Sequence, residues 1–167
     1  MKILVATEKP FAKKAVDGIR QIVEGAGYEL ALLEKYTDKS ELLSAVADVD
    51  ALIIRSDKVT AEVIEAARNL KIVVRAGAGY DNVDLAAATA RGIVVMNTPG
   101  QNSNAVAELA LAMMIFMARN GFTPGTGSEI QGKTLGIHAY GNVGRLVGRK
   151  GKAMGMNVIA YLSLIHI

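Results

Sequence analysis

Short runs of branched apolar residues alternate with segments of helical spacing along the first part of the chain. The apolar runs lie at residues 3–6, 30–33, 51–54, 72–74 and 93–96. Continuous apolar runs of this length are typical of parallel strands, which are buried on both faces. Between two of them, Val16, Ile19, Ile22 and Val23 fall on one helical face. Repeated βα units therefore predict an α/β fold with a parallel sheet over residues 1–97.

A second module is expected over residues 98–161. Helix breakers and N-cap residues at 98–104 precede apolar residues at helical spacing, and a loop at 120–132 leads to a strand at 134–138. A helix from about Asn142 and a strand at 157–161 follow. Two strands alone leave open sheet edges. The helix that follows residue 104 contains three methionines that are expected to fill a core, Met113, Met114 and Met117. Residues 162–167 are interpreted as a non-native tail.

Composition and charge exclude several function classes. The chain has 167 residues, no Cys and a net charge of +3 that comes from 19 basic and 16 acidic residues. The sequence therefore offers no disulfide framework, and it has no basic stripe that would bind nucleic acid or lipid. The longest apolar run, residues 109–118, is shorter than the roughly 20 residues that span a bilayer. The short apolar stretch after Lys2 does not suit a secretory signal. A cytoplasmic protein without a membrane segment or a metal site is predicted.

A glycine turn at residues 139–144 connects a predicted strand to a predicted helix. In the dinucleotide motif G-x-G-x-x-G, the second glycine lets the backbone approach the pyrophosphate, and the third lets the helix pack closely on the strand. Gly141 and Gly144 hold these two places, whereas Ala139 replaces the first glycine, where a positive φ would be strained. A purely structural turn is the alternative. The ribose-binding carboxylate is expected about 20 residues on, where Leu162 stands instead.

Two further segments carry candidate binding groups. Residues 75–84 form a glycine-rich loop after a strand, and its amides suit an anion, although the glycines could instead only shape a βα turn. Arg75 lies at the carboxyl end of the strand, where open α/β sheets bind ligands. Arg55, Ser56 and Lys58 follow another strand. They are either donors to a carboxylate or phosphate, or solvated loop charges.

Taken together, these segments resemble the D-isomer-specific 2-hydroxyacid dehydrogenases from residue 2 to about residue 161. The matching segments, in the order of the family, are Ile53-Ile-Arg-Ser56 with Lys58-Val-Thr60, Val74-Arg-Ala-Gly-Ala-Gly-Tyr-Asp-Asn-Val-Asp84, Val95-Met-Asn-Thr-Pro99, Asn102-Ser103 with Ala107-Glu108, and Gly132-Lys-Thr-Leu-Gly-Ile-His138.

The resemblance implies a flavodoxin-like substrate domain over residues 1–97 and the first part of a Rossmann NAD-binding domain over residues 98–161. Substrate and NAD would meet in the cleft between the domains. The implied substrate is a small phosphorylated 2-hydroxy acid. Members of the family form homo-oligomers through the helix at about residues 105–118, so this chain is expected to expose apolar surface.

The resemblance also implies residue roles. Arg55 and Arg75 would face the substrate, the amides of Ala78 and Gly79 would hold its carboxylate, and Asn102 would lie at the cleft. The pyrophosphate turn would consist of Ala139, Tyr140, Gly141, Asn142, Val143 and Gly144. The catalytic arginine and the His–Glu pair of the family have no match here and are expected beyond the end of this chain. The alternatives are a dehydrogenase of the glycerate or lactate type and a non-catalytic module that senses a dinucleotide.

Overall fold

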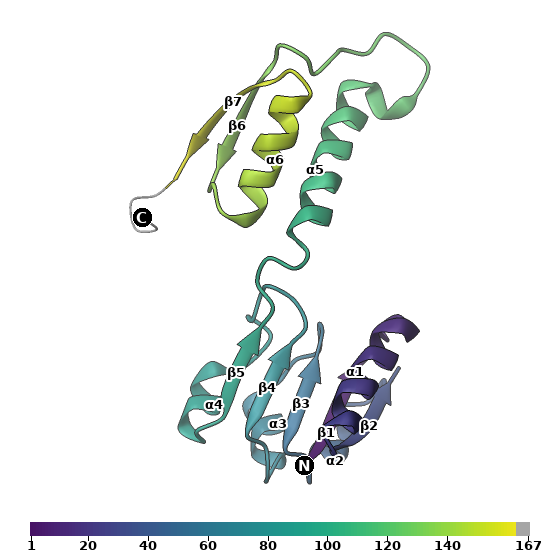
Figure 1. Ribbon diagram of the computed structural model, residues 1–167, viewed down its shortest axis with the longest axis vertical. Coiled ribbons are helices and arrows are strands. Elements are labelled where there is room, and N and C mark those ends of the chain that lie inside the picture. The colour runs from purple at the N-terminus through teal and green to yellow at the C-terminus, as the bar shows by residue number, and fades with distance from the viewer. Residues whose placement is uncertain (163–167) are drawn as a thin grey trace. The chain divides into compact units, whose positions relative to one another are not determined.

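The apolar runs of the first part of the chain form one parallel sheet, with strands in the order β2-β1-β3-β4-β5 (Figure 1). All four strand pairs are parallel. This order is that of flavodoxin-like folds, so the predicted fold class is confirmed. The strands are β1 (Lys2–Thr7), β2 (Glu29–Glu34), β3 (Ala51–Ile54), β4 (Ile72–Arg75) and β5 (Val94–Asn97).

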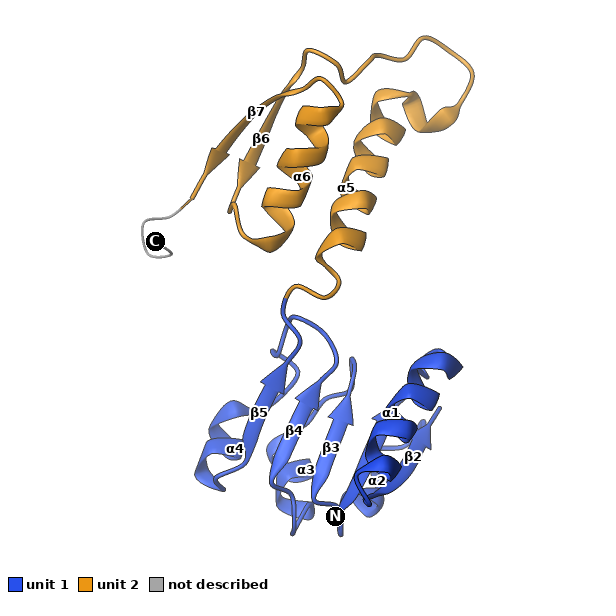
Figure 2. Ribbon diagram, in the orientation of Figure 1, with its two compact units in different colours: residues 1–99 blue, residues 100–167 orange. Residues whose placement is uncertain are grey.

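The computed structural model describes residues 1–162 and divides the chain into two compact units, residues 1–99 and residues 100–167 (Figure 2). Apart from Leu162, the expected non-native tail lies outside the described residues.

Helices cover both faces of the five-stranded sheet. They are α1 (Lys13–Gly25), α2 (Lys39–Ala45), α3 (Ala61–Ala66) and α4 (Leu85–Ala90). The chain moves from β1 to the edge strand β2 and then reverses direction to reach β3, β4 and β5. Because parallel crossovers are right-handed, this reversal places α1 on one face and the other three helices on the opposite face (Figure 1).

The main core lies under the three helices that share a face. Leu4, Leu52 and Ile54 are at most 2% exposed, and each fully buried aliphatic side chain contributes roughly 1.5–3 kcal/mol of transfer free energy. The face that carries α1 is less completely covered. Ile22 was expected on the buried face of α1, but it is 75% exposed. That expectation was wrong because Ile22 lies roughly 100° around the helix from the buried Val23, at the edge of the apolar stripe.

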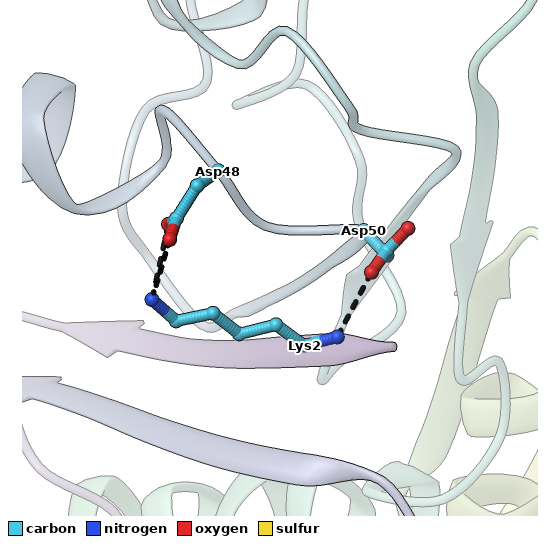
Figure 3. A network of polar contacts seen from close by, with 3 residues as sticks. All are labelled: Lys2, Asp48 and Asp50. Atoms are coloured by element: carbon cyan, nitrogen blue, oxygen red, sulfur yellow. Dashed lines mark hydrogen bonds and ion pairs between the residues drawn. The ribbon is translucent and has the colours of Figure 1, made fainter.

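Charged side chains at the amino ends of the strands pair with one another. The Lys2 ammonium bonds Asp48 at 2.9 Å, and the Lys2 backbone N–H donates to Asp50 at 2.9 Å (Figure 3). Lys71 donates to the other oxygen of Asp50 at 2.7 Å. Asp50 therefore connects the starts of β1, β3 and β4. The hydrogen bond from Lys71, followed by that from the Lys2 backbone, lowers the pKa of Asp50 below its ordinary value of 3.8.

We predict that Asp50→Asn makes unfolding less sensitive to acid. A carboxyl group whose pKa is lowered in the folded state adds stability above its ordinary pKa, and this contribution is lost as the pH falls through the folded-state value. Urea unfolding at about pH 6 and about pH 3 should therefore show a smaller difference in the variant than in the wild type. The exposed Asp17→Asn is the matched control. Equal acid sensitivity of Asp50→Asn and the wild type would contradict this role.

The second unit has fewer strands and much exposed apolar surface. It consists of α5 (Ser103–Ala118), a 3₁₀ turn at Asn120–Phe122, β6 (Thr134–His138), α6 (Asn142–Ala153) and β7 (Asn157–Tyr161). The parallel strands β6 and β7 form a two-stranded sheet, and α5 packs on α6 (Figure 1). These elements match the predicted order. None of the helices in residues 1–162 is both long and apolar enough to cross a bilayer.

The core role expected for the α5 methionines was wrong for two of them. Met113 is 59% exposed and Met117 is 73% exposed. The helix is apolar around most of its circumference, whereas α6 covers only the side that carries Ala107 and Leu111. The expected exposure of apolar surface on α5 is therefore confirmed.

Candidate functional site

Two arginines meet at the carboxyl ends of β3 and β4. Arg75 is the last residue of β4, and Arg55 directly follows β3. The Nε of Arg75 donates to the carbonyl oxygen of Arg55 at 2.9 Å, which fixes one guanidinium beside the other strand end. Within residues 1–162, neither guanidinium forms an ion pair. The structure thus places the Arg75 guanidinium against the backbone of Arg55, 20 positions earlier in the sequence, and within residues 1–162 the charges of both arginines are available to a ligand.

The glycine-rich loop that follows Arg75 is held from both sides. On one side, the side-chain amide of Asn82 donates to the Asp57 carbonyl at 2.7 Å. On the other side, the Asn97 side chain donates to the carbonyl of Ala78 at 2.7 Å. In the described part of the chain, the backbone N–H groups of Ala78 and Gly79 have no hydrogen-bond acceptor. Because most backbone donors in proteins are paired, two adjacent free donors suit an anionic ligand.

This edge of the sheet can therefore bind an anion in two ways at once. Arginine guanidinium groups form charge-assisted hydrogen bonds with carboxylate or phosphate, and the free loop amides add neutral donors. The Asp81 carboxylate lies beside Gly79, 3.0 Å from the position that a Cβ would take there. Within residues 1–162, Asp81 forms no ion pair with Arg55 or Arg75, so it leaves both guanidinium groups open to an anion.

Sequence reasoning missed the residue that organises this edge. Asp57 is only 4% exposed, and its carboxylate accepts from the Glu8 N–H at 2.8 Å, the Tyr36 hydroxyl at 2.8 Å and the Arg55 N–H at 3.3 Å. These donors follow three different strands. The only signal in the sequence was an acidic residue between Ser56 and Lys58, directly after a buried strand.

Tyr36 shares the environment of this carboxylate. Burial first, and then the hydrogen bond to Asp57, raise the pKa of the Tyr36 hydroxyl far above its ordinary value of 10. The Glu8 carboxylate contributes in the same direction. The phenol therefore stays protonated and keeps donating to Asp57 throughout the physiological pH range.

We predict that Asp57→Ala lowers the free energy of unfolding by about 2–4 kcal/mol, because it leaves the buried Tyr36 hydroxyl and the Glu8 N–H without an acceptor. Asp57→Asn keeps one carbonyl oxygen and should lose about 1 kcal/mol. Chemical denaturation measures both values. Tyr36→Phe, which removes a single donor, is the control. If Asp57→Ala costs no more than Tyr36→Phe, the carboxylate does not organise the strand ends.

The second unit holds the glycine turn between β6 and α6. Gly141 is the N-cap of α6 and has a φ of −80°, and nothing lies within 4 Å of the position that a Cβ would take. A Cβ on Gly144 would instead overlap the carbonyl oxygen of Ala139. Gly141 thus leaves room for a ligand, and Gly144 lets α6 approach the end of β6. These are the two roles that the motif requires.

Ala139 occupies the first place of the motif in a strained conformation. Its φ is +80°, in the left-handed region that favours glycine. A non-glycine residue pays of order 1–2 kcal/mol for such a conformation. The hydrogen bond from the Ala139 N–H to the Tyr161 carbonyl, at 2.9 Å, fixes the residue at the end of the sheet. The turn therefore keeps the shape that a glycine would give it.

The other predicted residues of this unit lie around the turn. Tyr140 lies against α6, where a Cβ on Gly148 would come within 2.8 Å of the tyrosine hydroxyl. The Asn142 side chain lies beside Gly100, 3.3 Å from the position of a Cβ there. Val143 is half-buried in the first turn of α6. Asn102 is the exposed N-cap of α5, two residues after Gly100. The segment before α5 and the glycine turn are thus close together.

The turn fits the diphosphate of a dinucleotide better than it fits the ribose. α6 has no acidic residue in its first turn, and the unpaired N–H groups at its start attract negative charge. At the end of β7, where a carboxylate would bind the ribose hydroxyls, Tyr161 and Leu162 are exposed. The Tyr161 ring packs edge-on to His138, with 5.2 Å between the ring centroids. No carboxylate stands at this place in the described sequence.

We predict opposite effects of the same substitution at the two glycines. Gly144→Ala should lower the stability of the second unit by about 1–3 kcal/mol, because its methyl group overlaps backbone that cannot move away freely. Gly141→Ala should leave the melting temperature nearly unchanged, since its φ is open to alanine and the space is free. Thermal unfolding followed by circular dichroism compares them. A larger loss at Gly141 than at Gly144 would overturn this assignment of the two roles.

The chain is similar to known proteins over nearly its whole length. A family model described as the catalytic domain of D-isomer specific 2-hydroxyacid dehydrogenases matches residues 4–161. The hydroxypyruvate reductase of Thermotoga maritima is 42% identical over 147 residues, which cover 80% of this chain and 48% of the relative. The D-3-phosphoglycerate dehydrogenase of Archaeoglobus fulgidus is 42% identical over 175 residues, which cover 96% of this chain and 32% of the relative.

Among solved structures, the NAD+-bound 3-phosphoglycerate dehydrogenase of Entamoeba histolytica superimposes with a TM-score of 0.93 and 52% sequence identity. The match covers 97% of this chain and 54% of that structure. The chain therefore spans about half the length of this structure and of the Thermotoga relative, and about a third of the Archaeoglobus relative.

Proposed function

Because this chain belongs to the D-isomer-specific 2-hydroxyacid dehydrogenase family, we propose that it is the N-terminal part of an NAD-dependent D-3-phosphoglycerate dehydrogenase. The reaction would oxidise the 2-hydroxyl of D-3-phosphoglycerate and yield 3-phosphohydroxypyruvate for serine biosynthesis. The observation that carries this proposal is the pair of unpaired guanidinium groups, Arg55 and Arg75, beside two free loop amides. We further propose that the full-length enzyme is cytoplasmic and homo-oligomeric.

Charge is the reason to favour a phosphorylated substrate. D-3-phosphoglycerate carries a carboxylate at one end and a phosphate at the other, and a site with two arginines can pair with both. The amides of Ala78 and Gly79 would hold the carboxylate, while Arg55 and Arg75 would face the negative charges. Hydrogen bonds to charged groups contribute roughly 1.5–3 kcal/mol each. A substrate without the phosphate leaves part of this binding energy unused.

In this proposal each unit has a separate task. Residues 1–97 form the substrate domain, and residues 98–161 form the first part of the NAD-binding domain, with Asn102 near the reacting groups. The turn from Ala139 to Gly144, with the side chains of Tyr140, Asn142 and Val143 around it, would hold the diphosphate through the backbone N–H groups that follow Ala139, because the Ala139 N–H is bonded to Tyr161. When bound, NAD supplies the acceptor for the hydride of the substrate carbon. The residues of this chain bind and orient the substrate, and none is proposed as a catalytic acid or base.

The test compares two substrates on the full-length enzyme that we propose contains this chain. Arg75→Leu should reduce kcat/KM for D-3-phosphoglycerate by about 100-fold and that for D-glycerate by about tenfold or less, because only the first loses its phosphate contact. NADH formation measures both. The control is Lys71→Leu, because this lysine lies at the amino ends of the strands and not at the carboxyl ends that carry the arginines. Equal losses on the two substrates would contradict phosphate recognition by Arg75.

The chain itself gives a second test. Hydride transfer needs a base and both substrates held in one geometry, so residues 1–167 alone should form no NADH from D-3-phosphoglycerate above background. Measurable turnover would show that no further residues are required and would overturn this part of the proposal.

A second candidate function is the reduction of hydroxypyruvate, which the name of the Thermotoga maritima relative suggests. Hydroxypyruvate has no phosphate, so this function predicts equal or better kcat/KM for the unphosphorylated substrate. A non-catalytic dinucleotide sensor, in contrast, should bind NADH without turning over any hydroxy acid. Calorimetric titration of this chain with NADH, together with the substrate comparison, separates the three functions.

A further inference from the structure

A pocket that several charged side chains line opens at the carboxyl edge of the first unit, near β1, β2 and β3. Its volume is about 450 Å³, within the roughly 300–1,000 Å³ of small-molecule sites. Open α/β sheets bind ligands where the strand order reverses, and here the reversal falls between β1 and β3. The residues that line the pocket are Glu8, Tyr36, Thr37, Lys39, Leu42, Ser56, Lys58 and Thr60. Neither Arg75 nor the glycine-rich loop is among them.

One part of this pocket offers hydrogen-bond acceptors. The Tyr36 hydroxyl donates its proton to the buried Asp57, so its oxygen can only accept a further hydrogen bond. Glu8 is exposed and forms no ion pair within residues 1–162, and its charge acts on the Tyr36 hydroxyl. The Glu8 carboxylate and a tyrosine oxygen that can only accept favour a ligand with a cationic hydrogen-bond donor, such as an ammonium group.

The donors of the pocket come from the segment after β3. Lys58 is exposed and forms no ion pair in the described part of the chain, whereas Lys39 is paired with Glu62. Within residues 1–162, the Oγ1 of Thr60, the N-cap residue of α3, is buried and has no hydrogen-bond partner, so a ligand in the pocket would bond it after a rotation of the side chain. A buried hydroxyl without a partner costs about 1–3 kcal/mol, so a ligand that bonds it would recover this free energy. The ammonium group of Lys58 and the free hydroxyl of Thr60 together favour a ligand that carries a carboxylate.

We propose that this pocket binds a small zwitterion of the amino-acid type. Its ammonium group bonds Glu8 and the Tyr36 oxygen, and its carboxylate bonds Lys58 and the Thr60 hydroxyl. A simple anion would leave Glu8 unpaired, and a simple cation would leave Lys58 and Thr60 unpaired. This second site does not depend on the proposed dehydrogenase activity, because it uses none of the residues assigned there to substrate or NAD.

The test is an NMR titration of the isotope-labelled 167-residue chain with glycine and with β-alanine. At least one should give saturable shifts of the amide signals of Glu8, Ser56 and Lys58, with a Kd on the order of millimolar. Acetate and methylammonium chloride, each carrying one of the two charges, should bind at least about tenfold more weakly. The absence of saturable shifts with both amino acids, or an equal response to acetate or inorganic phosphate, would overturn the proposal.

Four variants separate binding from folding. Lys58→Met and Glu8→Gln should each weaken binding by about tenfold or more, whereas Lys14→Met, at an exposed lysine of α1, should not. Thr60→Val removes the unpaired hydroxyl and keeps the shape of the side chain, so it should weaken binding while the melting temperature stays equal or rises. A lower melting temperature with unchanged binding would assign the hydroxyl to the fold and overturn its role here.

Discussion

The buried Asp57 carboxylate is the interaction on which the carboxyl edge of the first unit depends. Parallel strands end at one edge but do not by themselves fix the loops that leave it. Asp57 accepts from the Glu8 and Arg55 backbone and from the Tyr36 hydroxyl, so it joins the segments that follow β1, β2 and β3. A buried charge is stable only when it is fully hydrogen-bonded, so Asp57 ties these three loops to one another. Both polar sites of the first unit include residues of these loops.

A backbone constraint has the corresponding role in the second unit. Close packing of α6 on β6 requires that Gly144 carry no side chain, because the Ala139 carbonyl oxygen occupies that place. The path of the turn then forces a positive φ on Ala139, and the hydrogen bond to Tyr161 supports it. The strain of one alanine is small compared with the packing that the turn makes possible. This explains how a motif with two of its three glycines keeps its shape.

Periodicity in the sequence predicted the elements well, because strand and helix formation here follow local apolar patterns. The predicted strands at 134–138 and 157–161 coincide with β6 and β7. Exposure was predicted less well, since it depends on what packs against each face: Ile22 lies at the edge of the covered stripe of α1, and Met117 lies on a side of α5 that is exposed in the described residues. The places of Arg55 and Arg75 after two strands were predicted, and the structure adds that these strands, β3 and β4, are neighbours. Asp57 could not be found this way, because its partners lie up to 49 positions away.

The distribution of charge distinguishes the two edges of the five-stranded sheet. At the amino edge, Lys2 and Lys71 are paired with Asp48 and Asp50, so these charges serve the fold. At the carboxyl edge, Arg55 and Arg75 have no acidic partner in the described residues. The net charge of +3 cannot reveal this difference, because it counts paired and unpaired groups alike. An unpaired guanidinium group at the end of a strand adds little to folding and keeps its full charge for a ligand. The charges of the amino edge thus serve stability, whereas the carboxyl edge combines the stabilising Asp57 network with unpaired charges for a ligand.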